Sequence, residues 1–182
     1  MSTLCVSLLG GFRAFRDEAA ISGFRSQKAQ LLLAYLLLYR RRAHPRAILA
    51  DLFWSDSDNA QAQANLRSEL YHLRLLLNGP QSRFGKYLLT EGAAVRFNPH
   101  SSYWLDVEEF EKKLASAHGT SSEQRAELLC QAVELYQGDL LAGFYDDWVL
   151  VEQVHFKDLH LQALKDLIAH YQARQEDDQA IL

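Results

Sequence analysis

The chain has 182 residues, 48% of them hydrophobic and 23% charged, with a net charge of −4. This composition excludes a disordered or fibrous protein, and the length suffices for one large or two small domains. The longest apolar stretch, residues 31–39, is far shorter than the roughly 20 residues of a membrane-spanning helix, so we expect a soluble cytoplasmic protein with no membrane contact.

The first part of the chain predicts two short strands and two helices. Residues 4–15, LCVSLLGGFRAF, are apolar and aromatic with two glycines in the middle, as in a pair of strands that meet at glycine. Ser26 is a suitable N-cap for a mostly buried helix, which the basic run at residues 40–42 closes at its negative end. A proline at position 45 then begins a short helix that reaches residue 53.

A third helix and a β-hairpin follow. The helix is expected from residue 59 to residue 77, where the Asn-Gly-Pro sequence at residues 78–80 ends it. Residues 87–90 and 95–97 flank a turn that contains Gly92, which predicts a hairpin. Strands, three helices and a hairpin in this order predict a winged helix-turn-helix.

The polar, proline-containing segment at residues 98–102 marks the boundary between two predicted domains, residues 1–98 and residues 99–182. Residues 1–100 hold 13 Lys and Arg against 7 Asp and Glu, a net charge of +6, whereas residues 101–182 hold 6 against 16, a net charge of −10. Such asymmetry is typical of a protein in which one part meets a polyanion. Chance segregation of surface charge is the alternative explanation.

The second domain is expected to be helical, at residues 107–117, 123–136 and 148–175. In the last two segments the apolar residues that mark one face are Leu128, Leu129, Ala132, Val133 and Tyr136, and then Val151, Leu161, Leu164, Leu167, Ile168 and Tyr171. Helical hairpins of this size build tetratricopeptide-like repeats, so the predicted fold is mainly α with small β-sheets. Residues 176–182 predict a turn and the start of another helix, which indicates a domain truncated at its C-terminus.

The third helix has the pattern that DNA recognition requires, with one apolar face and one face of long polar side chains. Its apolar stripe consists of Leu66, Leu70, Leu73 and Leu77. Its polar surface offers glutamine for adenine, arginine for guanine or phosphate, and hydroxyl groups for phosphate. A solvated helix face is the alternative, and the neighbouring basic residues favour DNA because each neutralised phosphate adds affinity through counterion release. The predicted DNA-binding residues are Arg40, Arg41, Arg42, Gln63, Arg67, Ser68, Tyr71, Arg74, Lys86 and Arg96.

Several motifs resemble one known family in their order along the chain. These are LLGGFRAF, SQKAQLLLAYLLLYR, AILADLFWSDSDNAQAQANLRSELYHLRLLL, YWLDVEEFEKKL and LYQGDLLAGFYDDWVLVEQVHF. The first three are similar to the amino-terminal DNA-binding domain of the Streptomyces antibiotic regulatory protein family. The last two are similar to the bacterial transcriptional activator domain that follows it.

This resemblance implies a transcription activator that binds direct repeats in promoter DNA and contacts RNA polymerase. It also implies that residues 65–74 form the recognition helix, that Arg67 and Arg74 contact DNA, and that Trp54 is a core residue. The acidic helical half suits protein contacts, including self-association.

Other kinds of chemistry fit the sequence poorly. Residues 79–86 resemble a phosphate-binding loop, but five residues instead of four separate the glycines, and a tyrosine replaces the required Ser or Thr. Two Glu-x-x-His pairs, at residues 69–72 and 152–155, fall in different predicted domains. We therefore expect no enzyme, no cofactor and no metal. The alternative function is a protein-interaction scaffold whose winged helix does not bind DNA.

Overall fold

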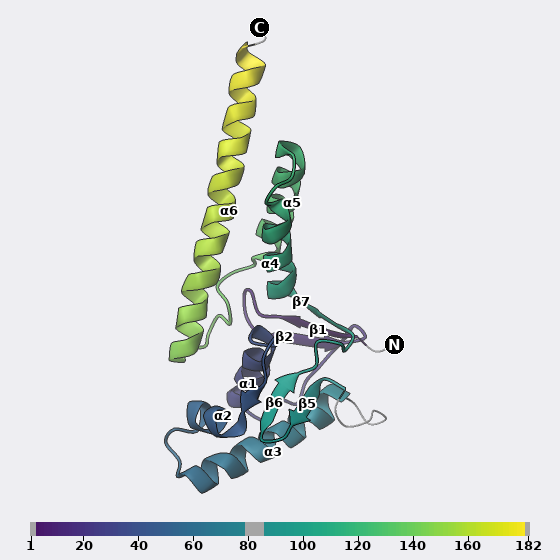
Figure 1. The fold of residues 1–182 in the computed structure, drawn as a ribbon, viewed down its shortest axis with the longest axis vertical. Helices are drawn as coiled ribbons and strands as arrows, with labels where there is room; N and C mark the ends of the chain where they lie inside the picture. The colour runs from purple at the N-terminus through teal and green to yellow at the C-terminus, as the bar shows by residue number, and fades with distance from the viewer. Residues whose placement is uncertain (1–2, 79–85, 181–182) are drawn as a thin grey trace. The chain divides into compact units, whose positions relative to one another are not determined.

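The computed structural model describes residues 3–78 and 86–180, without the side chains of residues 175–180 (Figure 1). The chain folds into two compact units. One comprises Met1–Cys5 and Ala14–Tyr103, and the other comprises Val6–Arg13 and Trp104–Leu182. These units depart from the predicted division into residues 1–98 and 99–182, because the short segment Val6–Arg13 packs in the second unit.

The first unit contains the three predicted helices, α1 (Gln27–Leu38), α2 (Arg46–Phe53) and α3 (Asn59–Asn78). The Ser26 hydroxyl accepts a hydrogen bond from the backbone N–H of Ala29 at 3.1 Å, which confirms the predicted N-cap of α1. Most of α1 is buried, so it forms the centre of this unit's core. The buried residues of α3 are Ala62, Leu66, Leu70, Leu73 and Leu77, which confirms the predicted stripe.

A three-stranded sheet in the order β4-β6-β5 completes the winged-helix arrangement. The hairpin strands β5 (Leu88–Glu91) and β6 (Ala94–Phe97) pair as predicted. The turn between them contains Gly92, whose φ of +58° is a left-handed conformation that glycine adopts without strain. The strand β4 (His44–Pro45), which the sequence did not predict, pairs with β6 directly before α2 begins. This pairing fixes the start of α2 against the hairpin.

A second sheet has four strands in the order β3-β2-β1-β7. The strands β1 (Leu4–Ser7) and β2 (Arg13–Arg16) confirm the predicted pair. The strand β3 (Ala19–Ala20) was not predicted. The strand β7 (Tyr103–Leu105) corrects the expectation that everything after residue 102 is helical. Its three residues form a strand only because β1 lies beside them, a long-range pairing that local sequence does not reveal.

The second unit contains the helices α4 (Asp106–Ala117), α5 (Ser122–Leu135) and α6 (Asp147–Ala180). The helix α6 continues to Ala180, so the turn predicted from residue 176 is wrong. One core cluster of this unit consists of Ala117, Ala126, Leu129, Ala163 and Leu167. Of the apolar face predicted for α6, only Leu167 is buried, whereas Val151, Leu161, Ile168 and Tyr171 are exposed.

A buried carboxylate explains why Val6–Arg13 belongs to the second unit. Asp106, only 3% exposed, lies at the start of α4. Its Oδ2 accepts hydrogen bonds from the backbone N–H groups of Leu8 at 2.7 Å and Leu9 at 2.8 Å, and its Oδ1 accepts one from Val107 at 2.8 Å. Burial raises the pKa of Asp106 to about 6, and the three N–H donors oppose this rise.

Candidate nucleic-acid interface

The helix α3 presents a polar face away from its buried stripe. The carboxylate of Asp58 accepts a hydrogen bond from the backbone N–H of Gln61 at 2.9 Å, which caps the helix at its N-terminus. The stripe of five buried residues then holds the helix against the core of the unit. Gln63, Arg67, Ser68 and Tyr71 are all exposed, so four of the five predicted contact residues of α3 lie at the surface.

Two amide pairs order the first two turns of α3. The amide of Gln63 donates to Oδ1 of Asn59 at 2.9 Å, and the amide of Gln61 donates to Oδ1 of Asn65 at 2.8 Å. Each pair joins residues four apart, which are neighbours on a helix surface. Each glutamine retains its own carbonyl oxygen and a second N–H for a ligand.

Arg67 and Tyr71 lie on the exposed side of α3, one helical turn apart. Arg67 forms no hydrogen bond or ion pair with any residue that the structure describes. Tyr71 is 50% exposed, and its ring contacts that of His72 edge to face, with 5.4 Å between the ring centroids. A long cationic side chain and an exposed tyrosine therefore lie on one surface.

Arg74 turns toward the hairpin instead of projecting from α3. Its Nη2 donates to Oγ1 of Thr90 at 2.8 Å and its Nε to the carbonyl of Leu88 at 3.4 Å, so these hydrogen bonds join α3 to β5. Burial lowers the pKa of Arg74, and the nearby Arg46 lowers it further. Arg46 also reaches Thr90, with 3.4 Å between Nη2 and Oγ1. Arg46 was not among the predicted contact residues, although it directly follows the proline that precedes α2.

The basic run after α1 divides into one buried and two exposed arginines. Arg40 is 5% exposed, and its guanidinium donates to the carbonyl of Leu37 at 3.2 Å at the end of α1. It closes the helix, as the sequence predicted, and is not presented to a ligand. Arg41 and Arg42 are exposed, and the Arg42 guanidinium lies 4.9 Å from the centre of the Tyr39 ring. Of this run, we therefore retain only Arg41 and Arg42 as candidate DNA-contact residues.

The hairpin carries the two remaining predicted residues. The Nζ atom of Lys86 lies 4.7 Å from the centre of the Tyr87 ring. The Nε atom of Arg96 lies 2.6 Å from Oε1 of Glu91, so the charge of Arg96 is neutralised within the hairpin. A paired guanidinium has to exchange partners before it binds a phosphate. We therefore expect Arg96 to contribute less to DNA affinity than Arg41 or Arg42.

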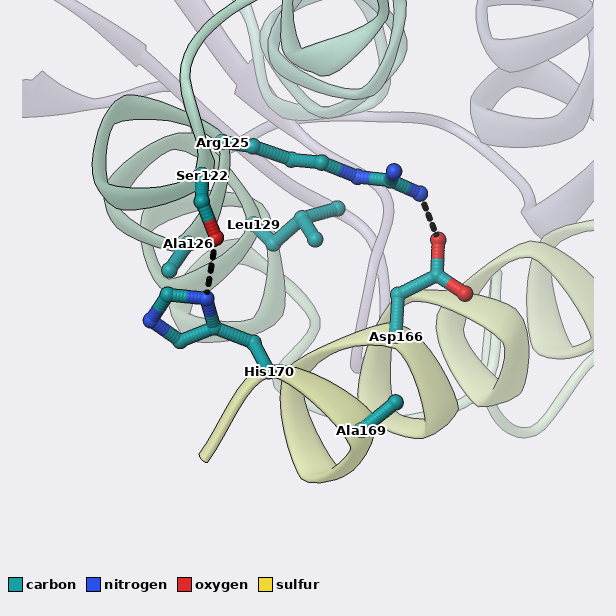
Figure 2. Close-up of a pocket in the computed structure, with 7 residues that line it drawn as sticks. All are labelled: Ser122, Arg125, Ala126, Leu129, Asp166, Ala169 and His170. Atoms are coloured by element: carbon teal, nitrogen blue, oxygen red, sulfur yellow. Dashed lines mark hydrogen bonds and ion pairs between the residues drawn. The ribbon is translucent and has the colours of Figure 1, made fainter. Parts of the chain in front are cut away.

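The second unit contains a cavity of about 250 Å³ between α5 and α6, shown in Figure 2. Ser122 Oγ lies 2.9 Å from His170 Nδ1, and Arg125 Nη2 lies 2.6 Å from Asp166 Oδ2. Because Asp166 binds Arg125 and the Gln162 amide, it does not orient His170 as the acid of a hydrolase triad does. The described residues hold no cluster of three metal-ligating side chains.

The sequence of the second unit matches a known domain family. Residues 105–182 match the model of the bacterial transcriptional activator domain. The chain is also 30% identical over 168 residues to the regulatory protein AfsR of Streptomyces coelicolor. This alignment covers 87% of the chain and 16% of AfsR. Residues 105–182 therefore contain a bacterial transcriptional activator domain, and most of the chain is similar to AfsR. The resemblance found in its motifs is confirmed.

A solved structure supports the fold of this chain. The structure of Mycobacterium tuberculosis EmbR in complex with a low-affinity phosphopeptide matches with a TM-score of 0.82 and 20% identity. The match covers 100% of this chain and 48% of the EmbR chain, so both relatives are considerably longer than this chain. The predicted fold, a winged helix followed by a helical activator domain, is confirmed. None of the described helices is long and apolar enough to cross a membrane.

Proposed function

We propose that the first unit binds promoter DNA in a sequence-specific manner through α3. The observation that carries this proposal is the two-sided character of α3, whose leucine stripe is buried while Gln63, Arg67, Ser68 and Tyr71 are exposed. The major groove of DNA admits a helix of this kind, and the winged-helix arrangement presents α3 next to the hairpin (Figure 1).

The exposed residues divide by chemistry between bases and phosphates. Gln63 and Arg67 have the planar, bidentate groups that read adenine and guanine. Ser68 and Tyr71 have hydroxyl groups that bind phosphate oxygens, and Arg41 and Arg42 supply positive charge outside α3. In this proposal α3 selects the sequence, and the basic residues around it supply most of the affinity.

We further propose that the whole regulator binds direct repeats in promoters and contacts RNA polymerase. The family resemblance supports both steps. The net charge of −10 on residues 101–182 supports a division of labour, since this half is repelled by DNA and is left for protein contacts.

The test is a DNA-binding titration of the chain as it stands. Sites are selected from a randomised library, and affinity for the selected site and for random DNA is measured by fluorescence anisotropy over a series of salt concentrations. If four phosphates are neutralised, the logarithm of the affinity should fall against the logarithm of salt concentration with a slope of about −3.6. Absence of any binding even at low salt would contradict the proposal and favour the protein-interaction scaffold.

Self-association through α6 is a second proposed activity. Six apolar side chains of this helix are not buried and form an apolar stripe, with successive spacings of four, seven, three, four and three residues. They are Leu150, Val154, Leu161, Leu164, Ile168 and Tyr171. This is the heptad spacing of paired helices, with Val154, Leu161 and Ile168 in one position and Leu150, Leu164 and Tyr171 in the other. A second copy of α6 carries the same spacing, so we propose that it packs against these exposed side chains.

Replacing Leu161 and Ile168 together by glutamate should convert a dimer into a monomer, because each charge would be buried in the paired seam. Sedimentation equilibrium measures the change, and the Kd of the dimer should rise by about 100-fold or more, because two apolar contacts of about 1.5 kcal/mol each are lost. Ala173→Glu adds the same kind of charge to an exposed position of α6 outside the stripe and should leave the dimer intact. A monomeric wild-type chain would contradict the proposal.

A further inference from the structure

Two guanidinium groups from different helices meet at one hydroxyl of the hairpin. Arg46 is the first residue of α2, Arg74 lies in the last turns of α3, and Thr90 is in β5. Nη2 of Arg74 lies 2.8 Å from Thr90 Oγ1, and Nη2 of Arg46 lies 3.4 Å from the same atom. The side chain of Thr90 is exposed, so this meeting point opens to solvent.

Among the residues that the structure describes, this pair of cations has no anionic partner. In the described part of the chain neither Arg46 nor Arg74 forms an ion pair, and the nearby carboxylate of Glu91 binds Arg96 instead. The Nε atom of Arg46 is buried and donates no hydrogen bond to a described residue. Two like charges held together, with a donor left over, are stabilised most strongly when an anion binds between them.

We propose that Arg46, Arg74 and Thr90 form a binding site for one phosphodiester of the DNA backbone. The proposal rests on the proposed DNA-binding function and deepens it. A phosphate oxygen accepts hydrogen bonds from both guanidinium groups and from the threonine hydroxyl, all of which are donors. Because the three side chains come from α2, α3 and β5, the bound phosphate would fix α3 and the hairpin on the DNA together.

The site assigns different roles to the two arginines of α3. Arg74 is held against the hairpin by Thr90 and Leu88, so it binds phosphate and does not read a base. Arg67 is exposed and is left for base recognition. A phosphate contact contributes equally on every DNA sequence, whereas a base contact contributes only on the preferred sequence.

The decisive variant is Arg46→Gln in the whole chain. Affinity should fall about tenfold on the selected site and by the same factor on random DNA, and the magnitude of the salt slope should decrease by about 0.9, the value for one phosphate. Arg46→Lys keeps the charge and should restore the slope but only part of the affinity. Arg25→Gln removes an equal charge from an exposed position of the same unit and should leave the slope within error of the wild type.

Thermal unfolding of each variant shows whether it is folded. If Arg46→Gln does not fold, Thr90→Val is used in its place, since it removes the hydroxyl and keeps the side-chain shape. Thr90→Val should weaken binding to the selected site and to random DNA by the same factor.

The outcomes separate this inference from the function on which it rests. A wild-type chain that fails to bind DNA overturns both. A wild-type chain that binds, together with an Arg46→Gln variant of unchanged affinity and slope, overturns the phosphate site alone. A loss confined to the selected site would show base reading and also overturns it. Stabilisation of the wild type but not of Arg46→Gln by inorganic phosphate, with DNA binding unchanged, would indicate a free-anion site and overturn the assignment to DNA.

Discussion

Simultaneous replacement of Arg67 and Arg74 by alanine should reduce the affinity for the selected DNA site by about 100-fold or more, because each arginine contact contributes about 1–3 kcal/mol. Arg67 is exposed on α3 and has no described partner, so its guanidinium is available to a base without the loss of an internal contact. Arg74 is already held against Thr90 and Leu88, so its guanidinium is preorganised for a phosphate.

The single variants separate the two contributions. Arg67→Ala should lower the ratio of specific to random binding and leave the salt slope nearly unchanged. Arg74→Ala should weaken both kinds of binding and reduce the slope by about 0.9. Arg25→Ala removes one exposed charge from the same unit and controls for long-range electrostatics. An unchanged ratio in Arg67→Ala would contradict the assignment of this residue to base recognition.

The measurement needs a check on the fold of Arg74→Ala. This variant removes two hydrogen bonds that join α3 to β5, and the hairpin could separate from the helix. Circular dichroism and thermal unfolding detect such a loss. Arg74→Lys retains the charge without the planar fork, so it should preserve the slope but lose part of the affinity if the site is as proposed.

Local sequence was sufficient to predict the helices and the hairpin of the first unit. The spacing of Leu66, Leu70, Leu73 and Leu77 identifies the buried face of α3, because residues three and four apart lie on one side of a helix. Gly92 with its flanking apolar residues identifies the hairpin. Both signals are confined to short segments of chain.

The features that were missed depend on segments far apart in the sequence. The position of Arg46 in the proposed site follows from Thr90, which is 44 residues away, so no local pattern singles it out. In the run of residues 40–42 the three arginines have the same chemistry, and only the end of α1 determines that Arg40 is the buried one. Candidate contact residues can be selected from sequence, but their roles follow from neighbours that the fold supplies.

The prediction of the buried face of α6 was wrong for a related reason. This helix has two apolar stripes, one including Phe156, Ala163 and Leu167, which is buried, and one including Leu161 and Ile168, which is exposed. Periodicity marks both and does not say which of them packs against α5. Contacts with Ala126 and Leu129 in the core of the unit decide the matter.

Replacement of Asp106 by alanine should destabilise the second unit by about 3 kcal/mol or more, because each buried N–H left without a partner costs about 1–3 kcal/mol. The backbone N–H groups of Leu8 and Leu9 both donate to Oδ2 of this residue, and no alanine atom replaces it. Urea unfolding followed by circular dichroism measures the effect. Asp158→Ala is the matched control, since this aspartate is exposed on α6.

The pH dependence of stability tests the same group in a second way. Burial raises the pKa of Asp106 to about 6 from the 3.8 of an unperturbed carboxyl group, so the folded state binds a proton more tightly than the unfolded state. The stabilisation due to this proton is complete below pH 3.8 and is lost as the pH rises through about 6. It amounts to about 3 kcal/mol for a shift of this size.

Asp106→Asn removes the titrating proton and keeps an oxygen acceptor in the same place. The free energy of unfolding of the wild type, minus that of Asp106→Asn, should therefore be larger at pH 4 than at pH 7, with the change between pH 4 and 6. Using this difference cancels the titration of the other carboxylates, which the two proteins share. If the difference stays constant over this range, Asp106 titrates equally in the folded and unfolded states. If it increases toward neutral pH instead, the three N–H donors prevail over burial, and the carboxylate is the form that the fold prefers.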